Sequence, residues 1–277
     1  MEKQQLEQRV KAHYAQPGLI HDILRRLDDL NINPNQLKRE DLSGLDEFHV
    51  RGSAVSLELA ESVNLHQLSV LDVGCGLGGP CRMLADKYDC DTQGIDLNED
   101  YVKAAQQLSE WVGLGRKTKF MVASATSLPF PDHSFDMVWT QHVQMNIPDK
   151  ELLYAEISRV LKPGGRFLYY DIFKAKEGSI TYPMPWAESQ ELSFLIRPDE
   201  MQRHLVDNGM EQVYAKDQTE AGVQFFEGLF SKIKASGPPK LGLNVLMGDS
   251  TQTKLTCLMQ HLEQRLLRLE SGVYLKR

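Results

Sequence analysis

The sequence has little of several features that mark particular protein classes. It contains four cysteines in 277 residues, and their spacing matches no common zinc pattern. No apolar run approaches the length that spans a bilayer. The N-terminal residues are polar and mixed in charge, unlike a secretory signal. We therefore expect a cytoplasmic protein with reduced thiols, without a membrane span and without a metal site.

An excess of positive charge is also missing. Lysine and arginine number 31 against 38 aspartates and glutamates, which gives a formal net charge of -7. Proteins that bind the nucleic-acid backbone are more often basic, so nucleic acid is not the expected partner. A content of 42% hydrophobic and 25% charged residues is ordinary for a globular protein. Internal repeats and low-complexity tracts are absent from the sequence.

Three regions follow one another along the chain. Residues 1–64 have mainly helical spacing and are predicted to form an N-terminal helical cap. Residues 65–173 alternate short apolar strands with helices, which predicts a parallel sheet covered by helices on both faces. Residues 174–277 are interpreted as lid insertions and the C-terminal part of the sheet, ending in a strand. We expect one α/β domain over residues 1–277, with a Rossmann-like, doubly wound sheet.

Four glycines stand close together in the stretch VLDVGCGLGG, residues 70–79. Gly74, Gly76 and Gly79 satisfy the pattern G-x-G-x-x-G between a predicted strand and a predicted helix. Glycines there let the backbone approach a ligand, and the start of the helix offers free N–H groups. Taken alone, the pattern fits NAD, S-adenosylmethionine or a tight turn without a ligand.

Two aspartates help to separate these alternatives. Asp72 precedes the glycines at the end of the first predicted strand. A carboxylate there repels the pyrophosphate of NAD and attracts the ammonium and sulfonium groups of S-adenosylmethionine. Asp96 ends the second predicted strand, where a carboxylate binds the ribose hydroxyls of either cofactor or caps the helix that follows.

Three further sequence motifs follow the glycine-rich stretch, and together the four motifs form a specific pattern. The string D-x-G-C-G-x-G-G is followed by G-I-D-L, by L-P-F-x-D-x-S-F-D and by L-K-P-G-G. With these strings the sequence resembles the class I S-adenosylmethionine-dependent methyltransferases over residues 45–175. Among them it is most similar to small-molecule enzymes, the sarcosine/dimethylglycine and the quinone and tocopherol methyltransferases. The resemblance implies S-adenosylmethionine as cofactor, a small-molecule methyl acceptor and a seven-stranded sheet whose last strand is antiparallel.

The resemblance also assigns residues to the cofactor. Those implied to bind it are Asp72, Gly74, Cys75 and Gly76 at the methionine end, Asp96 at the ribose, Leu97, Ser124 and Ala125 around the adenine, Gln141, Tyr14 and Arg51. The family often has an aspartate where Ser124 stands, and that aspartate bonds the adenine amino group. A charged contact to the adenine is therefore missing from this segment.

Side chains for the acceptor are expected after the fourth strand and in the lid. His142 is the candidate general base, with a structural role as an equally weighted alternative. Tyr182 and Trp186 belong to an aromatic segment that either shapes a pocket or simply packs. His49 and Arg197 complete the substrate assignments, although surface pairing is the commoner fate of an arginine. These residues do not decide between an amine and a hydroxyl acceptor.

Two other functions are considered as alternatives to a methyltransferase. A nicotinamide-dependent oxidoreductase is disfavoured by Asp72 and by the string LPFPDHSFD. A non-catalytic binding protein that keeps the fold is disfavoured by the intact glycine loop. The C-terminal helices are compatible with a cover over the site and with a homodimer contact, so the sequence leaves the oligomeric state open.

Overall fold

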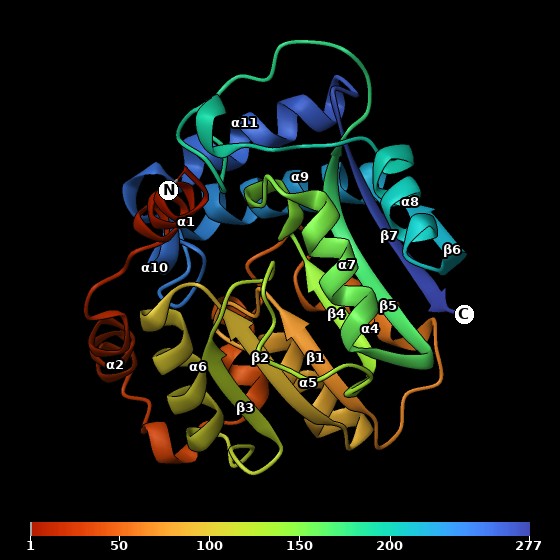
Figure 1. Ribbon diagram of the computed structural model, residues 1–277. Coiled ribbons are helices and arrows are strands. Elements are labelled where there is room, and N and C mark those ends of the chain that lie inside the picture. Colours follow the sequence, from red (N-terminus) through yellow and green to blue (C-terminus); the bar gives the residue numbers. More distant parts are fainter. Residues whose placement is uncertain (1) are drawn as a thin grey trace.

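A mixed seven-stranded sheet forms the centre of the computed structural model, which describes residues 2–277 (Figure 1). Its strand order is β3-β2-β1-β4-β5-β7-β6, and β7 runs antiparallel to both of its neighbours. The strands are β1 Ser69–Val73, β2 Asp91–Asp96, β3 Thr118–Val122, β4 Phe135–Gln141, β5 Leu161–Lys174, β6 Met210–Asp217 and β7 Leu267–Lys276. The predicted Rossmann-like sheet with an antiparallel last strand is confirmed.

Helices precede, connect and follow these strands. The α-helices are α1 Glu2–His13, α2 Leu19–Asp29, α3 Ser43–Asp46, α4 Ser53–Glu61, α5 Gly79–Tyr88, α6 Glu99–Trp111, α7 Lys150–Val160, α8 Pro198–Asp207, α9 Thr219–Ser236, α10 Asn244–Met247 and α11 Thr251–Glu263. Short 3-10 turns cover Pro34–Gln36, Arg39–Leu42, Gln144–Asn146, Gln190–Leu192 and Gly248–Ser250. Within residues 2–277, no helix combines the length and the apolar character needed to cross a membrane.

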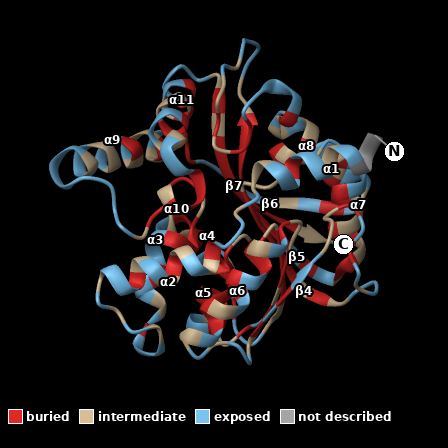
Figure 2. Cartoon of the chain, turned by 90° about the vertical axis from the view of Figure 1, so that its left-hand side faces the viewer, coloured by how far each residue is buried: buried red, intermediate tan, exposed pale blue. Residues whose placement is uncertain are grey.

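The long strand β5 shows how the sheet separates two hydrophobic cores. Because successive side chains of a strand point to opposite faces, alternate residues join different clusters. Leu168 and Tyr170 pack with helices α4, α5, α9 and α11, whereas Phe167 and Tyr169 pack with α7 and α8. Figure 2 shows the resulting pattern, with buried strands in the centre and exposed residues on the outer sides of the helices.

Strand β6 was not predicted as an individual strand from the sequence. It is the edge strand beyond β7, and Met210 is its one buried residue. An edge strand with so little burial lacks the clear apolar alternation that predicts strands elsewhere in the chain. Its hydrogen bonds to β7, which lies 50 residues later in the sequence, define it instead.

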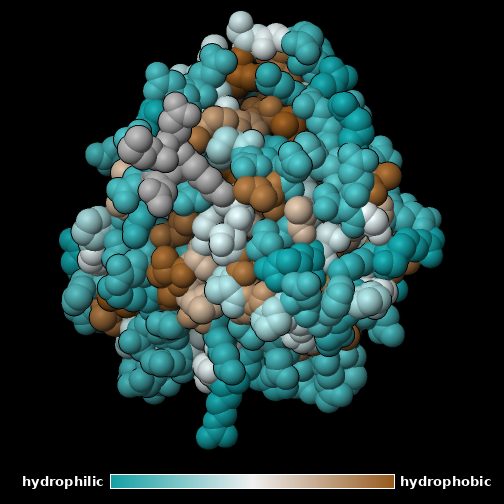
Figure 3. All heavy atoms as spheres, in the orientation of Figure 1, coloured by the Kyte–Doolittle hydropathy of each residue, from teal (hydrophilic) through white to brown (hydrophobic). Residues whose placement is uncertain are grey.

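The parallel strands β1 to β4 carry the functional end of the molecule. Their carboxyl ends point toward the region where α1, α9, α10 and α11 gather (Figure 1). In the same orientation the surface is mostly hydrophilic, and apolar side chains collect in patches near its centre and its top (Figure 3). Ligands of open α/β sheets bind at the carboxyl ends of the strands, so this end is the place to look for a site.

Candidate active site

The glycine loop between β1 and α5 lies close to two neighbouring segments. The backbone N–H groups of Gly74 and Cys75 both donate to the carbonyl of Ile95, at 2.8 and 2.9 Å. Gly74 has a φ of 75°, and a Cβ atom there would lie 2.5 Å from Cγ2 of Val143. The loop therefore needs glycine both for its left-handed backbone and for its contact with the segment after β4.

Asp96 ties the end of β2 to this loop. Its carboxylate accepts hydrogen bonds from the backbone N–H of Gly76 at 3.0 Å and from that of Asn98 at 2.8 Å. Burial raises the pKa of Asp96, and these backbone donors oppose that shift. The side chain that caps helix α6 is that of Asn98, which accepts from the N–H groups of Asp100 and Tyr101. Asp96 is thus left to face the cavity.

Asp72 is a buried carboxylate with a single weak donor. Its Oδ2 accepts from the thiol of Cys81 at 3.4 Å, and no lysine or arginine pairs with it within the part of the chain that the structure describes. Burial raises its pKa to about 7, which the bond from Cys81 opposes. Such a group is stabilised by a ligand that brings a positive charge.

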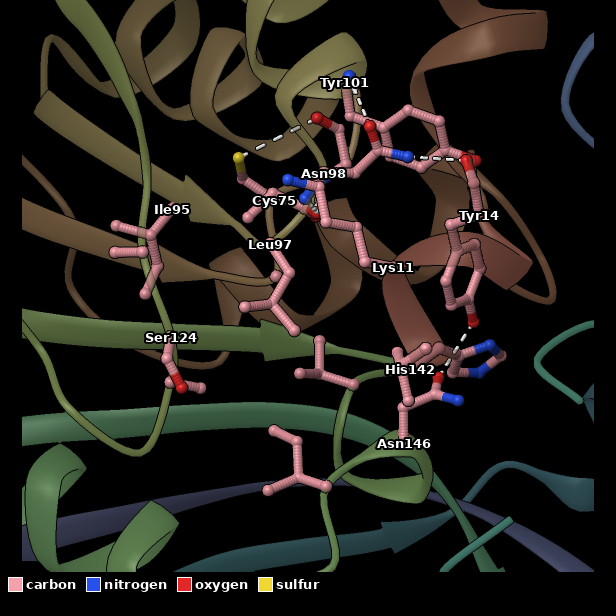
Figure 4. Close-up of a pocket in the computed structure, with 18 of the residues that line it drawn as sticks. Lys11, Tyr14, Cys75, Ile95, Leu97, Asn98, Tyr101, Ser124, His142 and Asn146 are labelled. Carbon is pink, nitrogen blue, oxygen red and sulfur yellow. Dashed lines mark hydrogen bonds between the residues drawn. The ribbon is translucent and has the colours of Figure 1, made fainter. Parts of the chain in front are cut away.

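A large cavity opens where these segments meet, and it holds about 1260 Å³ of space, part of it open to solvent. Figure 4 shows Cys75, Leu97 and Ser124 along one part of this cavity, and Tyr14, His142 and Asn146 along another. Twelve of the predicted site residues line it: Tyr14, His49, Asp72, Gly74, Cys75, Gly76, Asp96, Leu97, Ser124, Ala125, Gln141 and His142.

Several buried polar atoms at this cavity have no hydrogen-bond partner within residues 2–277. They are the Nε2 atoms of Gln141 and His142 and the hydroxyl of Tyr101. The other side-chain atom of Gln141, its Oε1, is held by Trp139 at 2.9 Å and Ser56 at 3.2 Å, which fixes the orientation of the amide. Because buried polar groups normally find partners, these atoms fit a polar ligand.

His142 occupies a constrained position just after β4. Its φ is 54°, and its backbone N–H donates to the carbonyl of Tyr170 at 2.8 Å. The imidazole lies against the ring of Tyr170, with the ring centres 4.9 Å apart, and near His49 at 5.8 Å. Burial, together with His49, lowers the pKa of His142 well below its ordinary value. His142 is therefore a neutral imidazole at pH 7.

A second cavity of about 470 Å³, part of it open to solvent, adjoins the first. The two share Tyr14, Phe48, His49 and His142 in their linings. Trp186, which was assigned to the substrate, lines this second cavity. The site thus consists of a polar cavity at the strand ends and a smaller cavity beneath the C-terminal helices.

Three predicted site residues lie outside both cavities. Arg51 bonds to Glu58 at 2.9 Å and to Gln218 at 2.7 Å, so carboxylate and amide partners hold it away from the cofactor region. Arg197 is half exposed and lies 3.4 Å from Asp199, as is common for a surface arginine. Tyr182 packs against the core that includes α11. Their assignment to the site therefore stays a prediction without support from the cavities.

The central part of the chain has a recognisable counterpart among known proteins. Residues 71–169, which contain the glycine loop, Asp96 and His142, match the family described as a methyltransferase domain. The chain contains a methyltransferase domain. The predicted site residues from Asp72 to His142 lie within the matched segment, whereas Tyr14, His49 and Trp186 lie outside it.

Curated relatives of this methyltransferase domain act on different molecules. Phosphoethanolamine N-methyltransferase 1 of Arabidopsis thaliana is 30% identical over 76% of this chain and 43% of its own length. Sarcosine/dimethylglycine N-methyltransferase of Halorhodospira halochloris is 31% identical over 54% of each chain. This chain thus spans about half the length, or less, of these relatives.

Solved structures agree on the fold of the methyltransferase domain. A sarcosine dimethylglycine methyltransferase from Galdieria sulphuraria, described as putative, has a TM-score of 0.67 at 18% identity, over 80% of this chain and 84% of its own. Phosphoethanolamine N-methyltransferase 2 of Haemonchus contortus, in complex with S-adenosyl-L-methionine, has a TM-score of 0.73 at 20% identity, over 86% and 55%. At these identities the likeness is one of fold.

Residues outside the methyltransferase domain complete the cavity, and of these Tyr14 and His49 were predicted from the sequence but Glu7 was not. Glu7 of α1 lines the first cavity and accepts a hydrogen bond from the hydroxyl of Ser124 at 2.7 Å. Tyr14, just after α1, donates to Oδ1 of Asn146 at 2.8 Å, and its carbonyl accepts from Asn98. Asn98 lies two residues after Asp96 and was detectable as a helix cap, whereas Glu7 lies 117 residues from its partner.

Proposed function

We propose that this protein is an S-adenosylmethionine-dependent methyltransferase that acts on a small-molecule acceptor. The observation that carries the proposal is the buried Asp72 carboxylate, which lacks a cationic partner among the described residues and stands at the mouth of the glycine loop. A positively charged cofactor suits it, whereas the pyrophosphate of a nicotinamide cofactor would be repelled. S-adenosylmethionine supplies, when bound, an activated methyl group on its sulfonium.

The residues around the cavity divide the binding of this cofactor among them. Asp72 and the glycine loop are proposed to hold the amino-acid end, and Asp96 the ribose hydroxyls. The unpartnered amide N–H of Gln141 is free to donate to the cofactor. His142 lies where the two cavities meet, which is where the methyl group and the acceptor are proposed to approach each other.

Isothermal titration calorimetry with three ligands tests this proposal. We expect S-adenosylmethionine and S-adenosylhomocysteine to bind, and NAD to show no heat of binding under the same conditions. Binding of NAD alone would instead support an oxidoreductase. Binding of the first two ligands without methylation of any amine, phenol or quinol would support a non-catalytic binding protein.

The affinity for S-adenosylhomocysteine is expected to rise about tenfold between pH 6 and pH 8. Burial raises the pKa of Asp72 to about 7, so the free protein holds a proton there in the acidic part of this range. A bound ammonium group favours the ionised carboxylate, so the proton leaves on binding and affinity levels off above pH 7. Calorimetry in two buffers with different ionisation enthalpies measures the released proton.

Two variants test whether Asp72 is the group whose titration makes the affinity for S-adenosylhomocysteine depend on pH. Asp72→Asn is expected to bind more weakly and to lose both the slope and the proton release. Asp136→Asn, which removes a carboxylate paired with Lys162 on the neighbouring strand, serves as the control and is expected to keep both. A slope that survives in Asp72→Asn would show that another group titrates.

Glu7→Gln is expected to reduce the protein's preference for an adenine base. A nucleoside held at Asp96 extends its base toward the next strand, β3, beyond which Ser124 and Glu7 form a hydrogen-bonded pair. A carboxylate there accepts from the amino group of adenine, a bond of about 1.5–3 kcal/mol. The wild-type protein should therefore bind S-adenosylhomocysteine at least tenfold more tightly than its deaminated analogue S-inosylhomocysteine.

Competition binding with the two nucleosides measures this preference in each variant. Glu7→Gln should reduce the ratio of the affinities for S-adenosylhomocysteine and S-inosylhomocysteine. Glu61→Gln, a change at an exposed glutamate on α4, should leave this ratio unchanged. An unchanged preference in Glu7→Gln would place the recognition of the base on other groups.

We further propose a cytoplasmic location. We propose a homodimer as the oligomeric state to be tested. The four cysteines are all free thiols, and three of them are buried, which suits a reducing compartment. Cell fractionation tests the location. Light scattering of the purified protein tests the oligomeric state, and a single mass near 31.5 kDa would exclude the dimer.

A further inference from the structure

The second cavity is built almost entirely from apolar side chains. Its aromatic part comes from the loop before α4, from the lid and from α9, namely Phe48, Trp186, Phe225 and Phe226. Aliphatic side chains of α11 close its far side, including Leu255 and Leu258. No lysine, arginine, aspartate or glutamate is among its described lining residues. Its chemistry therefore differs from that of the first cavity, which contains Asp72 and Asp96.

The histidines supply most of the polar character of this lining. Both ring nitrogens of His49 have protein partners, since Nε2 lies 2.6 Å from Glu47 and Nδ1 lies 3.3 Å from the carbonyl of Val50. His142 is different, because its buried Nε2 has no partner within residues 2–277. A ligand in the second cavity therefore meets an imidazole with an unpartnered nitrogen, on a residue that lines both cavities.

We propose that the second cavity binds the methyl acceptor, and that this acceptor is a neutral phenol or hydroquinone whose hydroxyl group lies at His142. The inference rests on the proposed methyltransferase function and narrows its substrate class. An aromatic body fits the apolar lining, to which Phe48, Trp186, Phe225 and Phe226 contribute aromatic faces. The hydroxyl group finds its hydrogen-bond partner at Nε2 of His142.

Charged acceptors fit this cavity less well. The carboxylate of an amino acid or the phosphate of a phosphoamine would be buried without a cationic partner, which is costly in an apolar surrounding. Aromatic faces do attract an ammonium group. However, an ammonium nitrogen has no lone pair to accept a methyl group until it loses a proton, and no carboxylate lines the second cavity to hold it.

The neutral state of His142 gives it a role in the reaction. Burial and His49 keep its pKa low, so it arrives as a free base. As the acceptor oxygen forms its bond to the methyl carbon, the carbon–sulfur bond of the sulfonium breaks and leaves a neutral thioether. The hydroxyl proton passes to Nε2 of His142 and then to solvent, which balances the charge lost from sulfur.

Binding to the protein before any turnover provides the first test. Trp186 is buried in the second cavity, so a phenol that enters should quench its fluorescence. Suitable probes are 4-propylphenol, 2-naphthol and a methylated hydroquinone, compared with sarcosine, phosphoethanolamine and a propylamine. We expect saturable quenching by the phenols only, and methyl ethers as products when S-adenosylmethionine is added.

Matched variants on one helix test the location of the acceptor. Phe225 lines the second cavity, whereas Phe230 on the same helix is likewise half-buried and lines neither cavity. Phe225→Ala should weaken phenol binding at least tenfold, and Phe230→Ala should change it less than twofold. Equal effects of both variants would overturn the assignment of this cavity.

His142→Asn tests the proton transfer, because asparagine tolerates the positive φ at this position. We expect kcat to fall about 10²–10⁴-fold at pH 7. The rate should recover as the pH approaches the pKa of the phenol, since a phenolate needs no base. Binding of S-adenosylhomocysteine should stay within a few-fold of the wild type.

Two outcomes would overturn the substrate class without touching the proposed function. One is methylation of sarcosine, phosphoethanolamine or the alkylamine in preference to the phenols. The other is normal binding of S-adenosylhomocysteine with no binding of any phenol. Absence of cofactor binding would instead count against the methyltransferase proposal itself.

Discussion

Asp96→Ala should weaken the binding of S-adenosylhomocysteine about 100-fold or more. The carboxylate is proposed to accept hydrogen bonds from the ribose, and two such bonds correspond to about 3 kcal/mol. The same side chain also holds the backbone N–H of Gly76 at 3.0 Å, so its removal loosens the glycine loop as well. Isothermal titration calorimetry of the purified variant measures the change in Kd.

The matched control for this variant lies at the opposite end of the same strand. Asp91 begins β2, is exposed, and faces Lys117 at a distance of 3.4 Å. Asp91→Ala should therefore leave both Kd and thermal stability close to the wild type. A cofactor affinity that is unchanged in Asp96→Ala would show that the ribose is held by other groups.

Asp46→Ala is expected to be among the most destabilising single substitutions in the chain. Arg82 is completely buried and pairs with Asp46, and it also donates to the carbonyl of Leu77 at 2.6 Å and to the hydroxyl of Ser109 at 3.0 Å. Removal of Asp46 leaves a buried guanidinium without its counter-charge, at a cost of about 3–5 kcal/mol. Differential scanning calorimetry should show Tm lowered by about 10 °C.

A double variant distinguishes this charge effect from a loss of packing. Replacing Arg82 as well, in Asp46→Ala/Arg82→Met, removes the unpaired charge and should recover part of the lost stability. Asp22→Ala is the surface control, because its pairs with Arg25 and Arg26 are partly exposed and worth less than about 1 kcal/mol. A double variant less stable than Asp46→Ala would show that packing of the Arg82 side chain dominates.

The sequence was informative wherever the site depends on short-range geometry. Asp72 lies near the end of β1, Gly74 follows that strand and Asp96 ends β2, and the carboxyl ends of parallel strands meet at one edge of a sheet. Gln141 ends β4, and His142 follows it. Their meeting around one cavity could therefore be predicted without knowing how the rest of the chain folds.

The parts that escaped prediction depend on contacts between distant segments. Arg51 was assigned to the cofactor, but its actual partner Gln218 lies 167 residues away. Glu7 was not singled out, although it reaches Ser124 across the cavity. Such pairs arise from the docking of helices onto the sheet, and no local pattern of residues encodes them. Strand β6 escaped for the related reason that its partner β7 comes much later in the chain.

The segment Glu2–Tyr14 borders both cavities through side-chain bonds to separate parts of the domain. Glu7 meets Ser124, Tyr14 meets Asn98 and Asn146, and His13 lies 3.3 Å from the carbonyl of Pro185 in the lid. Because this one segment borders both cavities, a ligand that binds in one of them also acts on residues that border the other. Thermodynamic linkage makes any such coupling mutual. The factor by which one ligand changes the affinity for the second equals the factor by which the second changes the affinity for the first.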